Sequence, residues 1–467
     1  MLPDSQSASE RESSAHANET IVAISTPPGR GGIGIVRLSG PRALEIASPL
    51  FKLRGALEHA RARFAEIVDS ETEAKLDEAV ITYFAGPNSY TGEDIVEIAA
   101  HGSPVVLDLL VRQSLSRGAI LARPGEFTER AFLSGRMDLT QAEAVRDLIE
   151  SQTLYQASVA AKQLGGALSR RIQPIKRSLV ELIAVLEAGI DFAEDDVDVT
   201  PDAQITARID AITVPLTELA RSFEQGRIVH SGLALAIVGR PNVGKSSLFN
   251  RLVERERAIV TAMPGTTRDL VTETVAIGGI PIELVDTAGL REAADEAESI
   301  GIQKSREALA DADLVLVVVD GSAATHHDEA DLIASLEGRR AIVIYNKSDL
   351  GNGSLPIPAG ESEIRAIRAS ALTGIGVDVL RYAILELVRS SSSGNEDGML
   401  TSVRHHQAVT TALENLTAAN VAVGTRIPHE MLLLDLYGAL RQLDSLTGET
   451  TADDVLNLIF STFCIGK

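Results

Sequence analysis

The chain has 467 residues, enough for about three domains of ordinary size. With 45% hydrophobic and 23% charged residues, its composition is that of a folded globular protein rather than a disordered or collagen-like one. The net charge of -22 and the 3% aromatic content argue against broad non-specific nucleic-acid binding and against a module that stacks RNA bases on aromatic rings. A single cysteine excludes an intramolecular disulfide and a multi-cysteine zinc site.

The chain begins with a polar segment. Residues 1–19 include several acidic side chains and no apolar core, so they fit neither a secretory signal nor a transit peptide, and we expect a disordered tail. The longest apolar run, Leu314 to Val319, is far shorter than the roughly 20 residues that cross a bilayer. We therefore expect a soluble, cytoplasmic protein with no membrane partner.

Residues 20–136 are predicted to form an α+β domain. Short β-rich runs (IVAIS, GIGIVRLSG, EAVITYF and DIVEIAAHG) have helical stretches between them. The segment Gly29–Gly34 matches the dinucleotide pattern GxGxxG, but it continues into a β-branched run where that motif requires a helix. We therefore expect a tight turn there rather than an NAD or FAD site.

Residues 137–231 are predicted to be the first part of a helical domain. Leucine and isoleucine recur at helical spacing through residues 164–186. Thr140 and Glu143 have the spacing of a capping box at a helix start. Pro174 is expected to interrupt or bend the helix that contains it.

Residues 232–390 carry a different pattern, in which the apolar strands LALAIVG, PIELVDTAG, LVLVVVD, AIVIYNKSD and IRAIRASA alternate with helical stretches. This alternation predicts a parallel sheet covered by helices. Residues 391–467 return to helical sequence, with leucines on one face of a helix near Leu432 and Leu436. We infer that the α/β domain is inserted into an all-α domain made of two separate pieces.

The strongest motif is Gly239–Ser246, GRPNVGKS, which is the phosphate-loop pattern GxxxxGK[ST] between a strand and a helix. Its glycines let backbone N–H groups surround phosphate oxygens. Lys245 brings a positive charge to the terminal phosphates, and Ser246 provides a hydroxyl ligand for Mg²⁺. The pattern predicts a phosphate-binding loop.

A second motif identifies the base. Asp349, in the sequence NKSD after a predicted strand, can accept two hydrogen bonds from guanine, whereas adenine has no such pair of donors. The loops DTAG, GTTRD and Ser370–Ala371 follow the order found in translation-factor-like GTPases. The expected fold is therefore multidomain, with an α+β N-terminal domain, a discontinuous helical domain and an inserted P-loop GTPase domain. The residues expected to bind GTP are Asn242, Val243, Gly244, Lys245, Ser246, Ser247, Thr261, Thr266, Thr267, Asp286, Thr287, Ala288, Gly289, Asn346, Lys347, Asp349, Ser370 and Ala371.

The hydrolytic residues depart from those of Ras-like enzymes. Leu290 follows DTAG, where those enzymes place a glutamine that orients water. Asn242 is hypothesised to help hold a K⁺ ion that supplies the charge of an arginine finger. The alternatives are that Asn242 only stabilises the loop, or that Arg268 donates the charge in cis.

The chain resembles the tRNA modification GTPases of the MnmE (TrmE) family over nearly its whole length after residue 19. Beyond the GTPase motifs, the resemblance lies in TPPGRGGIGIVRLSG, PNSYTGEDIVEI, ARPGEFTERAFLSGRMDLTQAEAV and the terminal TGETTADDVLNLIFSTFCIGK. It implies a homodimer joined through the N-terminal domains, and a heterotetramer with an FAD-dependent partner of the MnmG/GidA type. That complex would modify the wobble uridine of certain tRNAs.

The resemblance also implies the chemistry and its residues. A 5-formyl- or 5,10-methylene-tetrahydrofolate would supply the one-carbon unit, and glycine or ammonium would complete a carboxymethylaminomethyl or aminomethyl group. GTP hydrolysis, stimulated by K⁺, would drive a conformational cycle. The residues implied are Arg37, Glu97, Arg136 and Lys467 for folate; Asn242, Thr261, Met263 and Thr266 for K⁺; Ser246 and Thr267 for Mg²⁺; and Glu298, with Asn242 and Lys245, for catalysis.

For several residues the sequence allows two interpretations. Cys464 is either a buried or weakly functional thiol or a participant in the modification chemistry, and His101 serves the folate site or caps its loop. The pair His405–His406 has no Cys or His partner at ligand spacing, so we predict surface residues. Arginine-rich stretches near Arg123 and Arg170 either face tRNA phosphates or are solvated helix faces. A ribosome-assembly GTPase is the alternative function, and NKSD disfavours a metabolic kinase.

Overall fold

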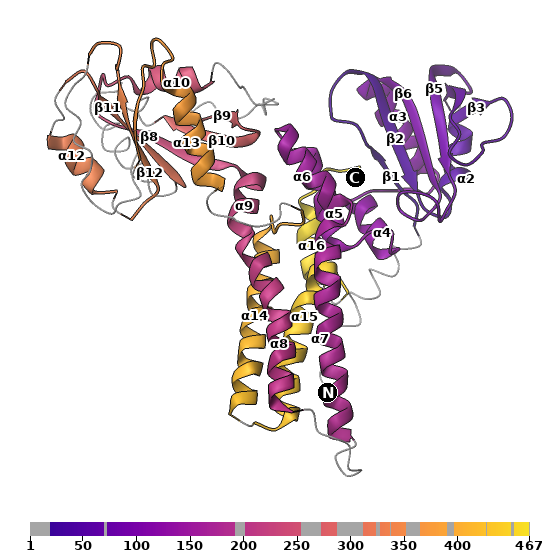
Figure 1. The fold of residues 1–467 in the computed structure, drawn as a ribbon. Helices are drawn as coiled ribbons and strands as arrows, with labels where there is room; N and C mark the ends of the chain where they lie inside the picture. Colours follow the sequence, from indigo (N-terminus) through magenta and orange to yellow (C-terminus); the bar gives the residue numbers. More distant parts are fainter. Residues whose placement is uncertain are drawn as a thin grey trace, which may run out of the picture. The chain divides into compact units, whose positions relative to one another are not determined.

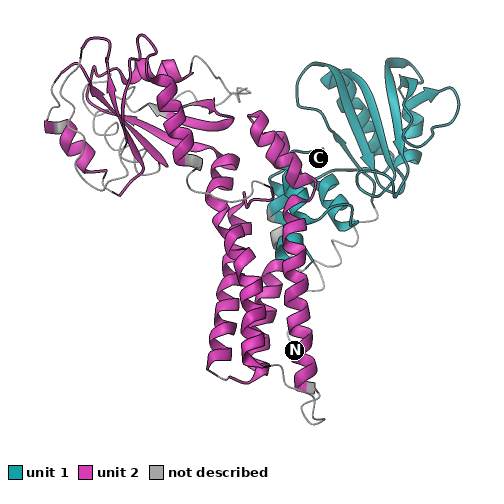
Figure 2. Ribbon diagram, in the orientation of Figure 1, with its two compact units in different colours: residues 1–146, 444–467 teal, residues 147–443 magenta. Residues whose placement is uncertain are grey.

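The computed structural model describes residues 19–69, 72–191, 201–253, 272–286, 312–323, 327–336, 338–351, 365–389, 397–425, 427–449 and 453–466. The chain forms two compact units, one of residues 1–146 and 444–467 and the other of residues 147–443 (Figure 2). The expected disordered tail, residues 1–19, lies outside the described residues except for its last residue.

The first unit is built on a seven-stranded sheet with the order β3-β4-β5-β6-β2-β1-β7. All its pairs are antiparallel except β1 with β7. The strands are β1 (Ile21–Ile24), β2 (Gly31–Ser39), β3 (Phe51–Leu53), β4 (Arg63–Val68), β5 (Lys75–Phe84), β6 (Ile95–Gly102) and β7 (Ile120–Leu121). The four predicted strands are confirmed, whereas β4 and the short β3 and β7 were not predicted.

Helices pack against this sheet, and the main core lies on one of its faces. The main core gathers alternate strand residues such as Val36, Leu38 and Ile98 against Leu107 and Leu110 of α3. A smaller cluster on the other side includes Ala23 and Phe127. The helices of this unit are α2 (Ala43–Ala47), the 3-10 turn η1 (Ser48–Leu50), α3 (Pro104–Ser116), α4 (Glu126–Leu133), the first part of α5 (Leu139–Glu150), and α16 (Asp453–Ser461).

Two sequence predictions in this unit have different outcomes. Strand β2 begins at Gly31, inside the GxGxxG segment, so the segment runs directly into a strand and not into a helix. The predicted capping box is wrong. Asp138 accepts from the N–H of Gln141 at 3.0 Å while the Gln141 side chain accepts from the N–H of Asp138 at 3.0 Å, so helix α5 starts two residues earlier than Thr140 would place it.

In the second unit, helices from both sides of the GTPase segment pack together, and Figure 1 shows α7, α8, α14 and α15 side by side. Helix α14 packs along α8, which packs against α7, so the discontinuous helical domain is confirmed. The helices are α6 (Leu154–Leu164), α7 (Ala167–Asp191), α8 (Asp202–Arg221), α9 (Phe223–Ser231), α14 (Val403–Gly424) and α15 (His429–Thr447).

Two features of these helices differ from the sequence predictions. Helix α7 continues through Pro174, so the proline does not interrupt it. Because Leu168 and Ile172 before the proline and Leu179 after it are all buried, packing on both sides outweighs one lost backbone hydrogen bond. His405 is buried rather than on the surface, and His406 stacks on the ring of Phe223 with centroids 4.3 Å apart.

The GTPase segment forms a six-stranded sheet with the order β13-β12-β11-β8-β10-β9. All pairs are parallel except β9 with β10, an antiparallel edge that the sequence did not predict. The elements are β8 (Leu233–Val238), β9 (Thr272–Ile277), β10 (Ile280–Asp286), β11 (Leu314–Asp320), β12 (Ala341–Asn346), β13 (Arg365–Arg368), α10 (Lys245–Val253), α12 (His327–Ala334) and α13 (Val377–Arg389). In the part of the chain described, no helix is both long and apolar enough to cross a membrane.

Candidate functional site

The motif residues of the GTPase segment gather at one edge of its sheet. Gly239 follows β8, Asp320 ends β11 and Asn346 ends β12, with Asp320 and Asn346 directly opposite each other in the register. Because parallel strands end on the same side, their loops meet at the carboxyl edge. This edge of the sheet is the expected place for a ligand.

The phosphate loop has backbone angles that only some residues tolerate. Gly239 has φ +149°, and a Cβ added there would lie 2.2 Å from the carbonyl oxygen of Val318. Asn242 adopts φ 64°, a left-handed conformation that asparagine accepts more readily than most residues. The Lys245 Nζ donates to the carbonyls of Gly239 at 2.9 Å and Arg240 at 2.8 Å. The ammonium group is thereby held against the loop that the sequence predicted.

Helix α10 begins directly at Lys245. Its N-terminus presents backbone N–H groups and the positive end of the helix dipole, which together attract a phosphate. Ser246 and Ser247 follow in the first turn, and both are exposed. The helix start therefore offers both N–H donors and hydroxyl oxygens at the loop.

Asn346 connects the phosphate loop to the base-recognition loop. Its side chain is buried; Nδ2 donates to the carbonyl of Val243 at 2.8 Å, and Oδ1 accepts from the N–H of Ala371 at 2.9 Å. The sequence predicted Asn346 as a nucleotide-binding residue but not this bridging role. Two loops that are far apart in the sequence thus share one side chain.

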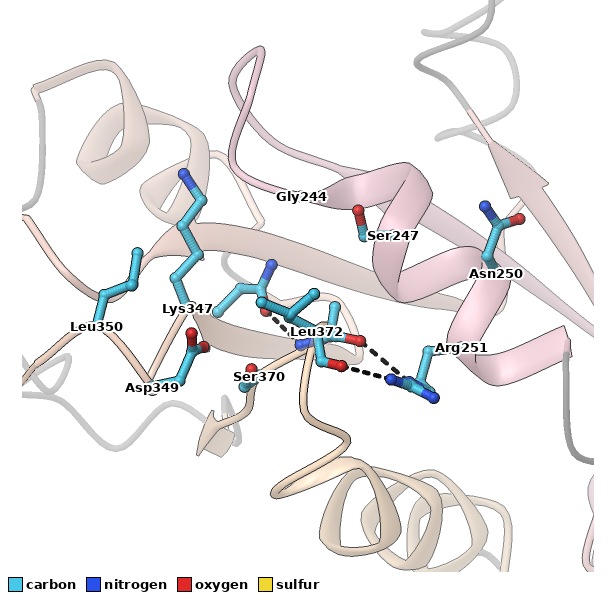
Figure 3. A pocket seen from close by; sticks show the side chains of 11 residues that line it. Gly244, Ser247, Asn250, Arg251, Lys347, Asp349, Leu350, Ser370 and Leu372 are labelled. Carbon is cyan, nitrogen blue, oxygen red and sulfur yellow. Dashed lines mark hydrogen bonds between the residues drawn. The ribbon is translucent and has the colours of Figure 1, made fainter.

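A cavity of about 450 Å³ opens beside Asn346 (Figure 3). It is large enough for a purine base, and its lining combines residues from the phosphate helix with residues from the NKSD and Ser370–Ala371 loops. The lining residues are Gly244, Ser247, Asn250, Arg251, Asn346, Lys347, Asp349, Leu350, Ser370, Ala371 and Leu372. The structure therefore brings together seven of the residues that the sequence predicted for GTP, including Asp349, the proposed guanine reader.

Lys347 is fixed by a partner that the sequence analysis missed. Its backbone has φ 62°, and its Nζ donates to Asp320 Oδ2 at 2.7 Å. Partial burial acts to raise the pKa of Asp320, but hydrogen bonds from Lys347 and Ser322 outweigh it and lower that pKa. The position of Asp320 at the end of the apolar run LVLVVVD was the sequence signal that could have indicated a residue at this edge of the sheet.

Part of the predicted site lies outside the described residues. Asp286 ends β10, and nothing is described of its side chain. The remaining predicted residues beyond the described ranges are Thr261, Met263, Thr266, Thr267, Thr287, Ala288, Gly289, Glu298 and Lys467.

A second polar site lies on the sheet of the first unit. Arg37 on β2 and Glu97 on β6 are directly opposite each other, and Glu97 Oε1 accepts from Arg37 Nε at 2.9 Å and Nη2 at 2.8 Å. Their side chains are 15% and 24% exposed, so the pair is largely shielded from water. Two residues expected to contact folate are thus brought together.

Aromatic rings flank Arg37. The guanidinium carbon lies 5.5 Å from the ring centre of Phe127 and 5.9 Å from that of Tyr90. The Tyr90 hydroxyl bonds Thr128 at 2.9 Å. Burial raises the pKa of Tyr90, although Thr128 and the charge of Arg37 act in the opposite direction. The guanidinium plane is therefore fixed by packing as well as by Glu97.

The C-terminal tail reaches the same site. The carbonyl of Gly466 accepts from Ser25 Oγ at 3.0 Å and from Arg37 Nη1 at 3.4 Å. Gly466 has φ +93°, and a Cβ there would lie 2.4 Å from the Ile24 carbonyl oxygen. An isolated β-bridge joins Pro124 to Ile465. Glycine is therefore required for the tail to pass so close to β1.

Three other residues have definite places. Cys464, in this tail, is exposed rather than buried. Arg136 is exposed, and its Cγ lies beside Gly92. The backbone N–H of His101 donates to Asp77 Oδ2 at 3.0 Å, and its ring Nδ1 bonds Asp77 Oδ1 at 2.6 Å. Asp77 is thus a structural partner for this histidine at the end of β6.

Comparisons with known proteins agree along most of the chain. The family model described as "GTP-binding protein TrmE N-terminus" matches residues 20–136, and "MnmE helical domain" matches residues 139–464. The tRNA modification GTPase MnmE of Koribacter versatilis is 62% identical over 96% of this chain and 99% of its own length. The protein of the same name from Aquifex aeolicus is 43% identical over 96% of this chain and 100% of its own length.

Solved structures give a weaker match. The G domain of the T. maritima FeoB iron transporter covers 33% of this chain and 98% of that chain at 26% identity, with a TM-score of 0.26. The family assignment depends on the family models and the full-length relatives.

Proposed function

The chain belongs to the MnmE family of tRNA modification GTPases, and from that premise we propose the reaction that it serves. With an FAD-dependent partner of the MnmG/GidA type, it adds a carboxymethylaminomethyl or aminomethyl group to the wobble uridine of certain tRNAs. A 5-formyl- or 5,10-methylene-tetrahydrofolate provides the one-carbon unit. The observation that supports this proposal most is the shielded Arg37–Glu97 pair on the N-terminal sheet, in a chain that also has a cavity lined by its GTPase motifs.

The nucleotide half follows from the cavity. Asp349 supplies a carboxylate for the N–H groups of guanine, while Ser370 and Ala371 line the same space. Lys245 and the N–H groups at the start of α10 neutralise the phosphates. In this proposal Ser246 and Thr267 bind Mg²⁺, and Glu298 orients the attacking water.

The proposed K⁺ site involves Asn242, Thr261, Met263 and Thr266. Of these, Asn242 is described: its side chain is exposed on the phosphate loop and carries a hard oxygen of the kind that K⁺ and Mg²⁺ prefer. A K⁺ ion would supply the charge that an arginine finger brings in other GTPases. Hydrolysis rates in potassium and sodium salts of equal ionic strength test this, and equal rates would exclude a specific K⁺ requirement.

The folate half rests on Arg37 and Glu97. A reduced pterin has a 2-amino-4-oxo pyrimidine edge like that of guanine, and a carboxylate is the complementary acceptor for its N–H groups. Glu97, held by Arg37 at 2.8 Å and 24% exposed, fits that requirement. Arg136 and Lys467 complete the proposed folate contacts by binding the negatively charged glutamate end.

The N-terminal sheet also supports a homodimer. Phe64 and Val80 are opposite each other on β4 and β5 and are 64% and 42% exposed. Paired large apolar side chains on a sheet surface favour contact with another protein surface. We propose that the two N-terminal domains meet, and equilibrium ultracentrifugation of the full chain measures it.

Nucleoside mass spectrometry tests the reaction. Total tRNA from cells lacking the gene should have lost the modified wobble uridine, and a wild-type copy should restore it. An unchanged nucleoside profile in the absence of the gene would reject the proposal. Folate binding is then measured separately, from the quenching of folate fluorescence by the purified full chain. Glu97→Gln should weaken folate binding without affecting GTP hydrolysis.

A further inference from the structure

One arginine ties the phosphate helix to the base-recognition loop. Arg251 lies in the last turn of α10, the helix that begins at Lys245. Its Nε donates to the carbonyl of Ala371 at 3.0 Å and its Nη2 to the carbonyl of Leu372 at 2.5 Å (Figure 3). The guanidinium therefore binds two successive carbonyls of the loop that closes one side of the cavity.

In the part of the chain that the structure describes, side chains from two other elements bind this loop. Asn346 accepts from the N–H of Ala371 at 2.9 Å, on the side facing the phosphate loop. Arg251 binds the carbonyl side, and it also lines the cavity. Inside the loop, Ser370 Oγ accepts from the N–H of Thr373 at 3.1 Å. Among the described residues, Arg251 provides the side-chain hydrogen bonds between this loop and α10, while Ala371 also belongs to the core cluster that contains Leu248 and Leu252 of α10.

We propose that Arg251 is a positioning residue for guanine-nucleotide binding. It holds the Ser370–Leu372 loop in the position from which the loop contacts the guanine base. It acts through the loop and does not read the base itself. A charged guanidinium forms stronger hydrogen bonds than a neutral donor, and its planar fork matches two neighbouring acceptors. The proposal concerns nucleotide affinity, so it is independent of the folate and tRNA chemistry proposed above.

The first test uses Arg251→Met, which keeps the apolar stem of the side chain and removes every donor. We expect GDP dissociation, followed with a fluorescent GDP analogue, to accelerate about tenfold, which corresponds to about 1.4 kcal/mol. KM for GTP should rise by a similar factor, while kcat at saturating GTP stays within about twofold. Arg251→Lys should recover part of the affinity, because an ammonium keeps the charge but lacks the planar fork.

Arg381→Met is the matched control. Arg381 on α13 also binds α10, donating from Nη2 to the carbonyl of Leu252 at 3.4 Å, but it does not line the cavity. Its loss should loosen the same helix without displacing the base loop. Equal acceleration of GDP dissociation in both variants would show that general loosening of α10 explains the effect, and would overturn the proposal.

Inosine nucleotides separate positioning from base reading. Inosine lacks the 2-amino group that Asp349 recognises but keeps the 6-oxo group. Arg251→Met should therefore weaken GTP and ITP binding by the same factor, whereas Asp349→Ala should abolish the preference for GTP. Unchanged GDP dissociation in Arg251→Met, or a loss that appears in kcat alone, contradicts the proposal. If Arg251→Met does not fold, Arg251→Lys is used in its place: a smaller acceleration of GDP dissociation that is equal for GTP and ITP supports the proposal, and unchanged dissociation contradicts it.

Discussion

The two sheets differ in where their candidate site residues lie. In the GTPase segment, the residues predicted to bind the nucleotide lie at or beyond the carboxyl ends of parallel strands, as Asn346 does at the end of β12 and Lys347 directly after it. In the first unit, Arg37 and Glu97 lie within strands, opposite each other in an antiparallel register. A loop site is built from contiguous motifs, whereas a site on a sheet face is built from residues that only the register brings together.

The difference also concerns how each site is stabilised. The nucleotide loops are joined by side chains that bind backbone atoms, such as Asn346 to Val243 and Ala371. The N-terminal site is joined by a charge pair and by a tail that arrives from the other end of the chain at Gly466. Substitutions should therefore act locally at the first site, and through the tail at the second.

The largest expected effect separates the two sites. Lys245→Ala removes the ammonium group from the phosphate loop, and we expect GTP hydrolysis to fall by at least about 100-fold, the usual loss when one donor to a developing charge is removed. Folate fluorescence quenching should be unchanged, because the N-terminal site shares no residue with the loop. A parallel loss of folate binding would show that the two sites are not independent.

The tail provides the next largest effect. Gly466→Val places a side chain where a Cβ would already lie 2.4 Å from the Ile24 carbonyl oxygen. We expect the tail to leave β1, so that carboxypeptidase removes the C-terminal residues about tenfold faster, given a strain of about 1–3 kcal/mol for a non-glycine residue at positive φ.

Gly135→Ala is the control for backbone strain alone. Gly135 also has positive φ, +71°, but a Cβ there would have no atom within 4 Å. Digestion of this variant should match the wild type. Equal acceleration in both variants would mean that the close approach to β1 is irrelevant.

The charge pair has a smaller effect. Arg37→Met, Glu97→Gln and the double variant form a cycle whose coupling energy we expect to be about 1.5–3 kcal/mol, the range for hydrogen bonds to charged groups. Hydrogen exchange of peptides from β2 and β6, measured in the full chain, reports the opening energy of these strands. Additive effects of the two substitutions would show that the pair contributes nothing to their stability.

The smallest effect depends on pH. Hydrogen bonds from Lys347 and Ser322 hold the pKa of Asp320 below its ordinary 3.8, although burial acts to raise it. The ionised Asp320 carboxylate therefore contributes its full stabilisation of the folded state at pH values above 3.8. This contribution is lost as the pH falls through the lowered pKa of the folded state. Asp320→Asn should lower the Tm at which the GTPase segment unfolds at about pH 6, but should lower it much less at about pH 2.5. A pH-independent difference would contradict this assignment.

Much of the fold could be predicted from the sequence. The five strands expected in the GTPase segment are all present. Buried parallel strands such as β11 and β12 are easy to predict because they are continuous apolar runs. The short β3 and β7 have too few residues to show an alternation. The start of α5 was misplaced because Thr140 and Glu143 match the same spacing rule as the true pair, Asp138 and Gln141.

The candidate sites were predictable to different degrees. The phosphate loop and NKSD are contiguous motifs, so their convergence on one cavity follows from the strand order. Arg37 and Glu97 carry no local pattern, and only the resemblance to a known family indicated them. The roles of Asp320, Ser25 and Arg251 depend on contacts between distant segments, which spacing along the chain does not encode.

The most direct test of the account asks whether both sites serve one reaction. Cells lacking the gene are complemented with wild type, Lys245→Ala or Arg37→Met, and the wobble uridine of their tRNA is analysed by mass spectrometry. We predict that neither variant restores the modified nucleoside, although purified Arg37→Met hydrolyses GTP at the wild-type rate. Full restoration by Arg37→Met would contradict a role for the N-terminal site in the modification.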